Sequence, residues 1–359
     1  MPTEDALQDD LAALPPRLTQ ALDELETLTR RMHPPLLADL VARTPMDADG
    51  LSAALDRVRL ATWPDALMSF RDQIVIAGES ILRAWSGFRA AAATGDLAGA
   101  YRASRQQYRA IEALYPLAGS LPIISRFFQE PDRRDDPAPL EASRHPNPDT
   151  GIFHHDNETS MRGGFSVYVP EYLTPDTPAP IIVALHGGAG HGRVFLWNWL
   201  REARSRGIIL VAPTATGDTW SLREPEIDTA HLSRVLDTVR TRWSIDPTKM
   251  LLSGMSDGGT FTLLSGLKAD SPFTHLAPVA ASFHPMLLTM SEPQRIRGLP
   301  IYLVHGALDW MFPIRVGRTA NETLRMAGAD VAFREIANLS HTYPRDENGA
   351  ILAWLTRER

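Results

Sequence analysis

One short stretch of the chain, residues 250–260, restricts the fold more than any other. It reads MLLSGMSDGGT, so an apolar run leads directly into Gly254, Ser256 and Gly258 at alternating positions. The pattern Gly-x-Ser-x-Gly is typical of a sharp turn between a strand and a helix, which lifts the serine hydroxyl out of the backbone. Glycine suits both flanking positions because a Cβ there would collide with the neighbouring strand or helix. Short turns of this composition are common, so the rest of the chain must decide its meaning.

The sequence after residue 150 supplies the strands and helices that such a turn needs. Strands are expected at 165–169, 181–185, 208–211, 250–252, 277–281, 301–304 and 331–336. Helices are expected around 194–205, 228–243, 260–267, 315–327 and 349–357. Apolar strands that alternate with helices predict an α/β fold, a mostly parallel, doubly wound sheet covered on both faces. Ligands of such sheets bind at the carboxyl ends of the strands.

The first third of the chain reads as helix. Apolar residues recur there at three- and four-residue spacing, as in Leu18, Leu22 and Leu25, which is the period of an amphipathic helix. We predict an all-α domain over residues 1–128, with five or six helices of ordinary length. Helix starts or ends are expected at Pro15-Pro16, Pro34-Pro35, Pro45, Pro64 and Pro116.

The composition changes again between the two parts. Residues 129–149 are rich in proline and charge and lack apolar periodicity, so we predict a linker there. The second domain is then expected over residues 150–359. Its chemistry can be examined separately from that of the helical part.

Composition excludes several classes of protein. The chain has 359 residues, a net charge of -7 and no cysteine. The acidic excess, almost all before residue 150, argues against nucleic-acid binding. Disulfides and thiolate metal sites are excluded. The first residues lack the pattern of a secretory signal, and no apolar run approaches the roughly 18 residues that span a bilayer. We expect a cytoplasmic protein, and the strong preference for arginine over lysine indicates a bacterial genome.

A serine nucleophile needs a base and an acid, and one candidate for each follows a predicted strand. Asp309 lies on the loop after strand 301–304, and His341 lies on the loop after strand 331–336. Both therefore fall at the edge of the sheet that carries Ser256. Ser256 would act as nucleophile, His341 as base and Asp309 as the group that fixes the imidazole tautomer.

Each of these assignments has an alternative. Ser256 could simply cap the helix that follows it. Asp309 could be a helix cap, with Asp218 or Asp346 as the acid instead. His341 could be a buried structural histidine.

Two backbone N–H groups are candidates for an oxyanion hole. One belongs to Asp257, directly after the serine, and the other to Gly188 in the loop HGGAG, residues 186–190. Such a donor typically contributes about 3 kcal/mol in the transition state. The carboxylate of Asp257 would oppose a developing oxyanion, so we expect it to turn away from the site and to be held by a cation or donor.

Other polar residues at strand ends are expected to be structural. His186 and His305 each precede a glycine and would orient loops. His284 lies nearer the site and could touch substrate. His154 and His155 resemble metal ligands, but adjacent residues on a strand point to opposite faces, so no metal or other cofactor is expected.

The walls of a substrate pocket are less certain from sequence, because core packing explains the same residues. The candidates on strand-end loops are Trp220, Met255, Phe283 and Trp310. The insert 283–300 is too short for a helical cap. Local loops should shape the pocket, with the helical domain either packed beside it or forming a homodimer interface.

Four segments together resemble a known family. They are LHGGAG (185–190), SGMSDGG (253–259), HGALDWMFP (305–313) and NLSHTYP (338–344). On these, the C-terminal ~210 residues are similar to the α/β-hydrolase superfamily, in particular its polyhydroxybutyrate-depolymerase-like and phospholipase/carboxylesterase branches. The resemblance does not cover the helical third. It implies ester hydrolysis through an acyl-enzyme, without a cofactor.

The expectation from the sequence is a serine hydrolase, a carboxylesterase on small or medium acyl esters. The same residues would serve a prolyl-oligopeptidase-type peptidase or a thioesterase. A non-catalytic binding module on the same fold is the alternative of another class. The expected partner is a small-molecule ester, not a nucleic acid or a membrane.

Overall fold

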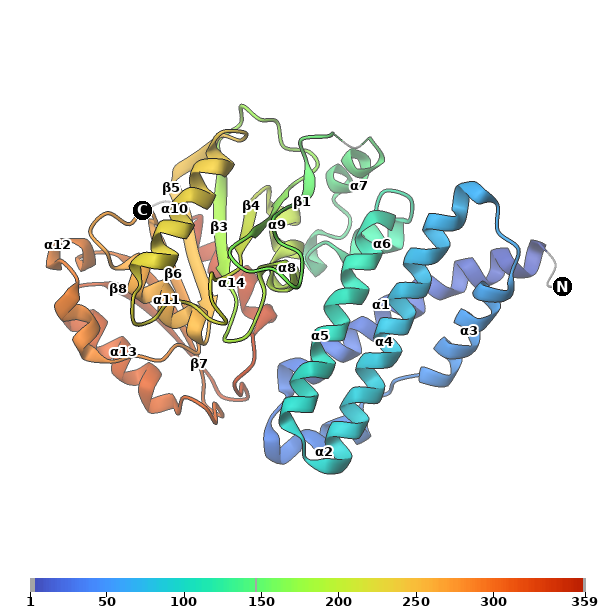
Figure 1. Ribbon diagram of the computed structural model, residues 1–359, viewed down its shortest axis with the longest axis horizontal. Helices are drawn as coiled ribbons and strands as arrows, with labels where there is room; N and C mark the ends of the chain where they lie inside the picture. Colours follow the sequence, from blue (N-terminus) through green and yellow to red (C-terminus); the bar gives the residue numbers. More distant parts are fainter. Residues whose placement is uncertain (1–3, 146, 358–359) are drawn as a thin grey trace. The chain divides into compact units, whose positions relative to one another are not determined.

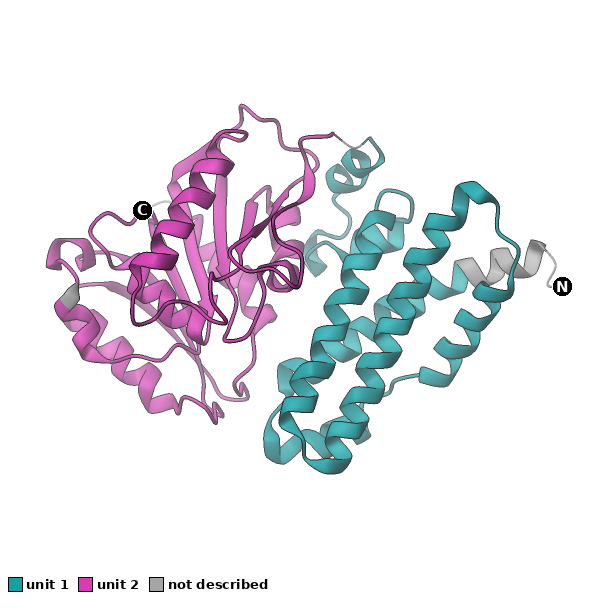
Figure 2. Ribbon diagram, viewed as in Figure 1, with its two compact units in different colours: residues 1–145 teal, residues 146–359 magenta. Residues whose placement is uncertain are grey.

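The computed structural model describes residues 4–145 and 147–357, and for residues 4–11 and Met290 it describes the backbone alone. The chain forms two compact units (Figure 2), unit 1 over Met1–His145 and unit 2 over Pro146–Arg359. This division falls inside the segment predicted as a linker.

Unit 1 is helical throughout its described residues, as predicted. Its α-helices (Figure 1) are α1 (Glu4–Arg31), α2 (Leu37–Arg43), α3 (Ala48–Leu60), α4 (Met68–Thr94), α5 (Leu97–Leu114), α6 (Pro122–Phe127) and α7 (Pro137–Arg144). The leucines predicted to share a face of α1, including Leu18 and Leu25, are fully buried. The chain reverses direction between α4 and α5 at Gly95, whose φ of 70° is the left-handed conformation that glycine adopts at helix ends.

One sequence expectation for unit 1 is wrong. Pro15 and Pro16 lie inside α1 and neither start nor end a helix. Leu14 and Leu18, both fully buried, anchor the helix on either side of the prolines, and this packing outweighs the backbone bonds that proline removes. The segment predicted as a linker, residues 129–149, contains the short helix α7. Asp136 accepts a hydrogen bond from the backbone N–H of Ala138 and so caps α7.

Unit 2 is built on one eight-stranded sheet of order β1-β2-β4-β3-β5-β6-β7-β8 (Figure 1). Its strands are β1 (Gly151–His155), β2 (Phe165–Val169), β3 (Ala179–Leu185), β4 (Ile209–Pro213), β5 (Ile245–Met255), β6 (His275–Val279), β7 (Pro300–Gly306) and β8 (Asp330–Ile336). The pairs β1–β2 and β2–β4 are antiparallel, and all others are parallel. The predicted mostly parallel α/β sheet is therefore confirmed.

Helices cover both faces of this sheet. They are α8 (Gly192–Phe195), α9 (Leu200–Arg206), α10 (Glu226–Arg240), α11 (Asp257–Gly266), α12 (Pro293–Ile296), α13 (Ile314–Met326) and α14 (Asn348–Leu355). Alternate strand residues such as Val183 and Leu252 join a core with α10, α11 and α13. On the other face, Tyr302 packs its ring against Trp354 of α14. Because both faces are buried, the strands read as continuous apolar runs.

The sequence missed the elements that are short or peripheral. Strand β1 lies at the sheet edge and is only half-buried, so it lacks the apolar run by which the other strands are recognised. Helix α12 has four residues, too few for a helical period. Among the described residues, no helix is both long and apolar enough to cross a membrane.

Candidate active site

Ser256 is the single residue between β5 and α11. Its φ of 56° and ψ of -119° lie in a region that residues other than glycine rarely occupy. The turn is held from both sides, since the Ser256 N–H donates to the carbonyl of Val279 (2.9 Å) and the Ser256 carbonyl accepts from the Thr260 N–H (2.8 Å). Such strain persists only where the surroundings impose it, and it is frequent at reactive residues.

The flanking glycines are required by contact and not by backbone angle. A Cβ on Gly254 would lie 2.4 Å from the carbonyl oxygen of Gly258. A Cβ on Gly258 would lie 2.4 Å from the carbonyl oxygen of His186 and 2.6 Å from that of Leu185. These are the collisions with a neighbouring strand or helix that the sequence pattern predicts for a side chain at either glycine. They also show that α11 begins directly against the end of β3.

Asp309, His341 and Ser256 form one continuous chain of hydrogen bonds. The His341 Nε2 is 3.0 Å from the Ser256 Oγ, and the His341 Nδ1 is 2.9 Å from the Asp309 Oδ2. All three side chains are buried, with Ser256 8% exposed. With a proton on Nδ1, facing the carboxylate, Nε2 is the ring nitrogen that can accept the serine proton.

The surroundings of Asp309 favour its charged form. Its Oδ1 accepts hydrogen bonds from the backbone N–H groups of Met311 (2.9 Å) and Phe312 (2.8 Å). Burial raises the pKa of the Asp309 carboxyl, but its hydrogen bond with His341 and those from the backbone outweigh burial and leave this pKa below its ordinary value. The two other candidate acids, Asp218 and Asp346, are exposed.

The glycine loop after β3 lies beside Ser256. A Cβ on Gly187 would be 3.6 Å from the Cβ of Ser256. His186, at the start of this loop, organises it. Its Nε2 accepts from the Ala215 N–H (3.1 Å), so Nδ1 carries the proton and donates to the Gly187 carbonyl (2.7 Å). Burial lowers the pKa of His186 to about 3, which fits a neutral, structural role.

Further contacts fix the rest of the loop. The Ala189 N–H donates to the carbonyl of Asp218 (3.2 Å), and Ala189 itself has a φ of 51°. Arg162 donates from one guanidinium to the carbonyls of Gly190 (2.7 Å), Gly217 (2.7 Å) and Asp218 (3.2 Å). Arg162 therefore joins the loop after β3 to the loop after β4.

Asp257 differs from the expectation. Its carboxylate does have a donor, because the Thr219 hydroxyl donates to Oδ2 (2.7 Å). It does not turn away from the proposed oxyanion loop, however. A Cβ on Gly188 would lie 2.8 Å from the Asp257 Oδ2, so the carboxylate lies against the residue whose N–H is the second candidate donor.

Of the four proposed substrate contacts, Trp220 is wrong. It is 1% exposed, stacks on Phe261 and donates its indole N–H to the carbonyl of His186 (2.7 Å), so it supports the loop from within the core. Trp310 is 43% exposed, and its ring lies 6.4 Å from that of His341. Met255 and Phe283 are half-buried.

The remaining histidines lie outside the hydrogen-bonded chain. His305 is buried behind Asp309 and is hydrogen-bonded through Nε2 to the Phe312 carbonyl (2.7 Å), which fits a loop-orienting role. His284 is exposed and caps a short 3-10 helix. His154 Nδ1 is 2.8 Å from the Ser166 Oγ, and His155 stacks on Phe165. Within residues 4–145 and 147–357, no cluster of three or more metal-ligating side chains gathers.

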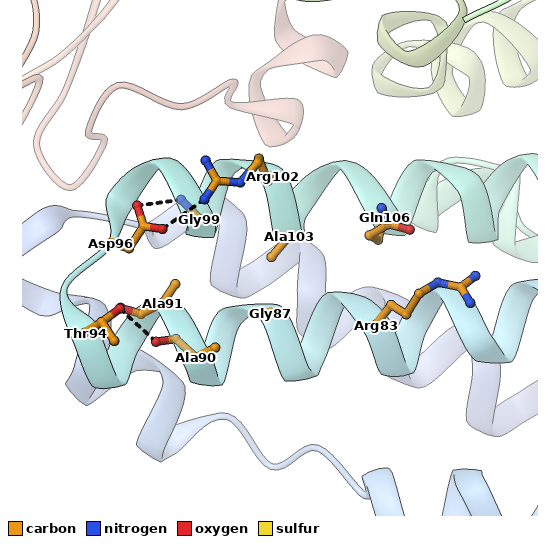
Figure 3. Close-up of a pocket in the computed structure, with 10 residues that line it drawn as sticks. All are labelled: Arg83, Gly87, Ala90, Ala91, Thr94, Asp96, Gly99, Arg102, Ala103 and Gln106. Carbon is orange, nitrogen blue, oxygen red and sulfur yellow. Dashed lines mark hydrogen bonds and ion pairs between the residues drawn. The ribbon is translucent and has the colours of Figure 1, made fainter.

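A separate hollow lies between α4 and α5 of unit 1 (Figure 3), with a volume of about 420 Å³. Small residues such as Gly87 and Ala103 line it, and a Cβ on Gly87 would lie 2.8 Å from that of Ala103. Its rim holds Asp96, which caps α5 and pairs with Arg102 (2.9 Å). These polar contacts are local to the start of α5.

Comparison with known proteins places unit 2 in a family. Residues 226–357 match the family described as phospholipase/carboxylesterase. That match contains the serine turn, Asp309 and His341, on a sheet of the expected topology. Unit 2 is an α/β-hydrolase.

Three curated relatives show how far the likeness of the α/β-hydrolase unit extends. The bifunctional acetylxylan esterase/xylanase XynS20E of Neocallimastix patriciarum is 31% identical over 147 residues, covering 40% of this chain and 21% of that protein. A poly(3-hydroxybutyrate) depolymerase of Ralstonia pickettii is 26% identical over 143 residues, covering 33% and 28%. Acyl-protein thioesterase 1 of Gibberella zeae is 26% identical over 120 residues, covering 32% and 50%. The chain spans from about a fifth to a half of the length of these relatives.

Proposed function

We propose that the protein is a serine hydrolase that cleaves carboxylic esters through an acyl-enzyme. The observation that carries the proposal is the continuous hydrogen-bonded chain from Asp309 through His341 to a serine held in a strained turn. A serine that merely caps a helix needs neither a buried imidazole at 3.0 Å nor a buried carboxylate behind it.

The first half-reaction would proceed from this geometry. His341 Nε2 takes the proton of the Ser256 hydroxyl while Oγ attacks the ester carbonyl carbon. The carbonyl oxygen becomes negative and is stabilised by the backbone N–H groups of Gly188 and Asp257. When the tetrahedral intermediate collapses, the bond from carbon to the alkoxy oxygen breaks, and His341 gives its proton to the departing alcohol. Asp309 holds the imidazolium in place throughout.

The second half-reaction returns the enzyme to its starting state. Water enters where the alcohol left, and His341 takes one of its protons as the oxygen attacks the acyl carbon. The intermediate releases the carboxylic acid, and Ser256 regains its proton from His341. In this step water replaces the serine hydroxyl as nucleophile and Ser256 replaces the alcohol as leaving group. His341 and Asp309 keep their roles, so no further protein group is required.

Carboxylic esters of small or medium acyl length are the proposed substrates. The named relatives include an esterase and a depolymerase of a polyester, which supports esters over amides. The relative named as an acyl-protein thioesterase supports thioesters as the second candidate. A panel of p-nitrophenyl esters and matched thioesters of increasing acyl length distinguishes the two.

Fluorophosphonate labelling tests the proposed nucleophile. The wild-type chain should be labelled and Ser256→Ala should not. Ser233→Ala, an exposed serine on α10, is the matched control and should be labelled like wild type. A folded wild-type protein that resists labelling would refute the proposal and leave the non-catalytic binding module as the better description.

Assembly and location remain proposals from the sequence. A homodimer through the helical N-terminal part would give a mass near twice 39.7 kDa in light scattering of the full chain. Residues 146–359 expressed alone should then be monomeric. A cytoplasmic location is tested by fractionation of the native host.

A further inference from the structure

Deepening the proposed function, on which this inference rests, we propose that the Asp257 carboxylate selects esters that carry a positively charged group and rejects those that carry a carboxylate. The residue after the serine supplies its backbone N–H to the proposed oxyanion hole. Its side chain is free to differ, and here it is an acid. The position of this acid is what carries the inference.

The carboxylate is held in a defined place. The Thr219 hydroxyl donates to Oδ2 at 2.7 Å, and Oδ2 lies against Gly188 on the opposite side of the proposed oxyanion hole. Asp257 is half-buried and stands in the first turn of α11, where the positive end of the helix dipole favours a negative side chain. Both supports fix the carboxylate, but neither neutralises it.

Among the described residues, no lysine, arginine or histidine forms an ion pair with the Asp257 carboxylate. The guanidinium of Arg162, which contacts the same glycine loop, is bonded to the carbonyls of Gly190, Gly217 and Asp218. A fixed negative charge therefore remains beside the position where an oxyanion would develop.

This charge discriminates between substrates. For a neutral ester it opposes the transition state, and for an anionic ester it also opposes binding. A cationic group on the ester, close to the scissile carbonyl, offsets the negative charge of Asp257 both when the substrate binds and in the transition state. Trp310, which is 43% exposed near His341, adds an aromatic face of the kind that attracts cations. The chemical class indicated is an ester with an ammonium group within a few ångström of its carbonyl.

Esters of matched shape test the proposal on the full-length protein. On the acyl side these are β-alanine ethyl ester (cationic), ethyl butyrate (neutral) and ethyl hydrogen succinate (anionic). On the alcohol side they are acetylcholine and its uncharged analogue 3,3-dimethylbutyl acetate. On at least one side, we expect kcat/KM to favour the cation by about tenfold to a hundredfold, as for largely solvated charges a few ångström apart. The comparison is with the anion on the acyl side and with the uncharged analogue on the alcohol side.

Two variants distinguish a local effect of Asp257 from an effect of the protein's net charge. In Asp257→Asn, the ratio of kcat/KM for the cationic ester to that for its matched partner should fall to within about threefold of unity. In Asp270→Asn, which removes an exposed carboxylate on the turn after α11, the ratio should stay as in wild type. A ratio that is unchanged in Asp257→Asn, or a wild type without preference, overturns the proposal.

If Asp257→Asn does not fold, the dependence of the wild-type ratio on salt concentration tests the proposal instead. Added NaCl should reduce the wild-type ratio several-fold, because screening weakens the interaction between partly exposed charges, and a ratio that salt does not change overturns the proposal. Labelling by a neutral fluorophosphonate separates this outcome from failure of the hydrolase itself. If wild type is labelled but shows no preference, only the role of Asp257 fails. If wild type is neither labelled nor active, both proposals fail.

Discussion

Replacing Asp309 by asparagine should disable the proposed base without disturbing the fold, and the structure dictates how. The Oδ1 position accepts hydrogen bonds from two backbone N–H groups, those of Met311 and Phe312. An asparagine must therefore place its carbonyl oxygen there. The opposite orientation would set an NH2 group against two N–H donors and cost roughly 2–6 kcal/mol, at 1–3 kcal/mol for each unsatisfied group.

This orientation turns the NH2 group of the asparagine toward His341. Since that group only donates, the His341 Nδ1 must become the acceptor, and the ring proton moves to Nε2. Nε2 can then no longer take the proton of the Ser256 hydroxyl. The loss expected from the wrong tautomer is about 10⁴ in kcat, or roughly 5.4 kcal/mol at 1.36 kcal/mol per tenfold change.

The assay is kcat for p-nitrophenyl acetate, together with the rate of fluorophosphonate labelling and a thermal melt. Asp346→Asn and Asp218→Asn are matched controls, because each removes one exposed carboxylate that the sequence left as an alternative acid. Both should keep kcat within about twofold of wild type. Activity of folded Asp309→Asn within tenfold of wild type, or a large loss in either control, would refute the reasoning.

Three further predictions concern the loops that support the site. Arg162→Ala should lower kcat more than it raises KM, and added guanidinium ion should restore part of the lost kcat. If Arg162→Lys loses as much kcat as Arg162→Ala and guanidinium ion rescues neither variant, the three carbonyl contacts of Arg162 do not position the loop. Because burial lowers the pKa of His186 to about 3 in the folded state, while an unfolded histidine has a pKa near 6.5, the unfolded chain binds one more proton between these values. The free energy of unfolding should then decrease as pH falls from about 6.5, by up to about 1.4 kcal/mol per pH unit from this group. In His186→Gln, the free energy of unfolding measured by chemical denaturation should depend less steeply on pH, by the equivalent of about one proton. Gly258→Ala should destabilise unit 2 by about 1–3 kcal/mol or prevent folding, since its Cβ meets two carbonyl oxygens, whereas Gly187→Ala, whose Cβ would make only ordinary contacts at 3.5 and 3.6 Å, should melt within a few degrees of wild type.

The sequence was most informative where function follows from order along the chain. Parallel strands bring their carboxyl ends to one edge of the sheet, so the sequence alone groups the residues that follow three of the strands. His341 does lie within hydrogen-bonding distance of both Ser256 and Asp309. The glycines of the turn were readable for the same reason, because their constraint arises from elements adjacent to them in sequence or in the sheet.

The features that sequence reasoning missed depend on long-range contacts without a local pattern. Arg162 reaches residues 28 to 56 positions away, and Thr219 meets Asp257 across 38 positions. Trp220 lies in a loop, where no periodicity indicates whether a side chain faces the core or the solvent. At Pro15 the local propensity predicts a helix boundary, but the long-range packing of Leu14 and Leu18 overrides it.

The contact of Gly258 with the end of β3 has a consequence for how such a protein can change over generations. Since the first turn of α11 rests on the carbonyls of Leu185 and His186, the serine and the glycine loop move as one body and cannot drift independently. Mutations that reshape this body would disturb both halves of the reaction together. New substrate preferences should therefore arise at separate supports, such as the loops that carry Thr219 and Trp310, while the backbone around Ser256 stays constant.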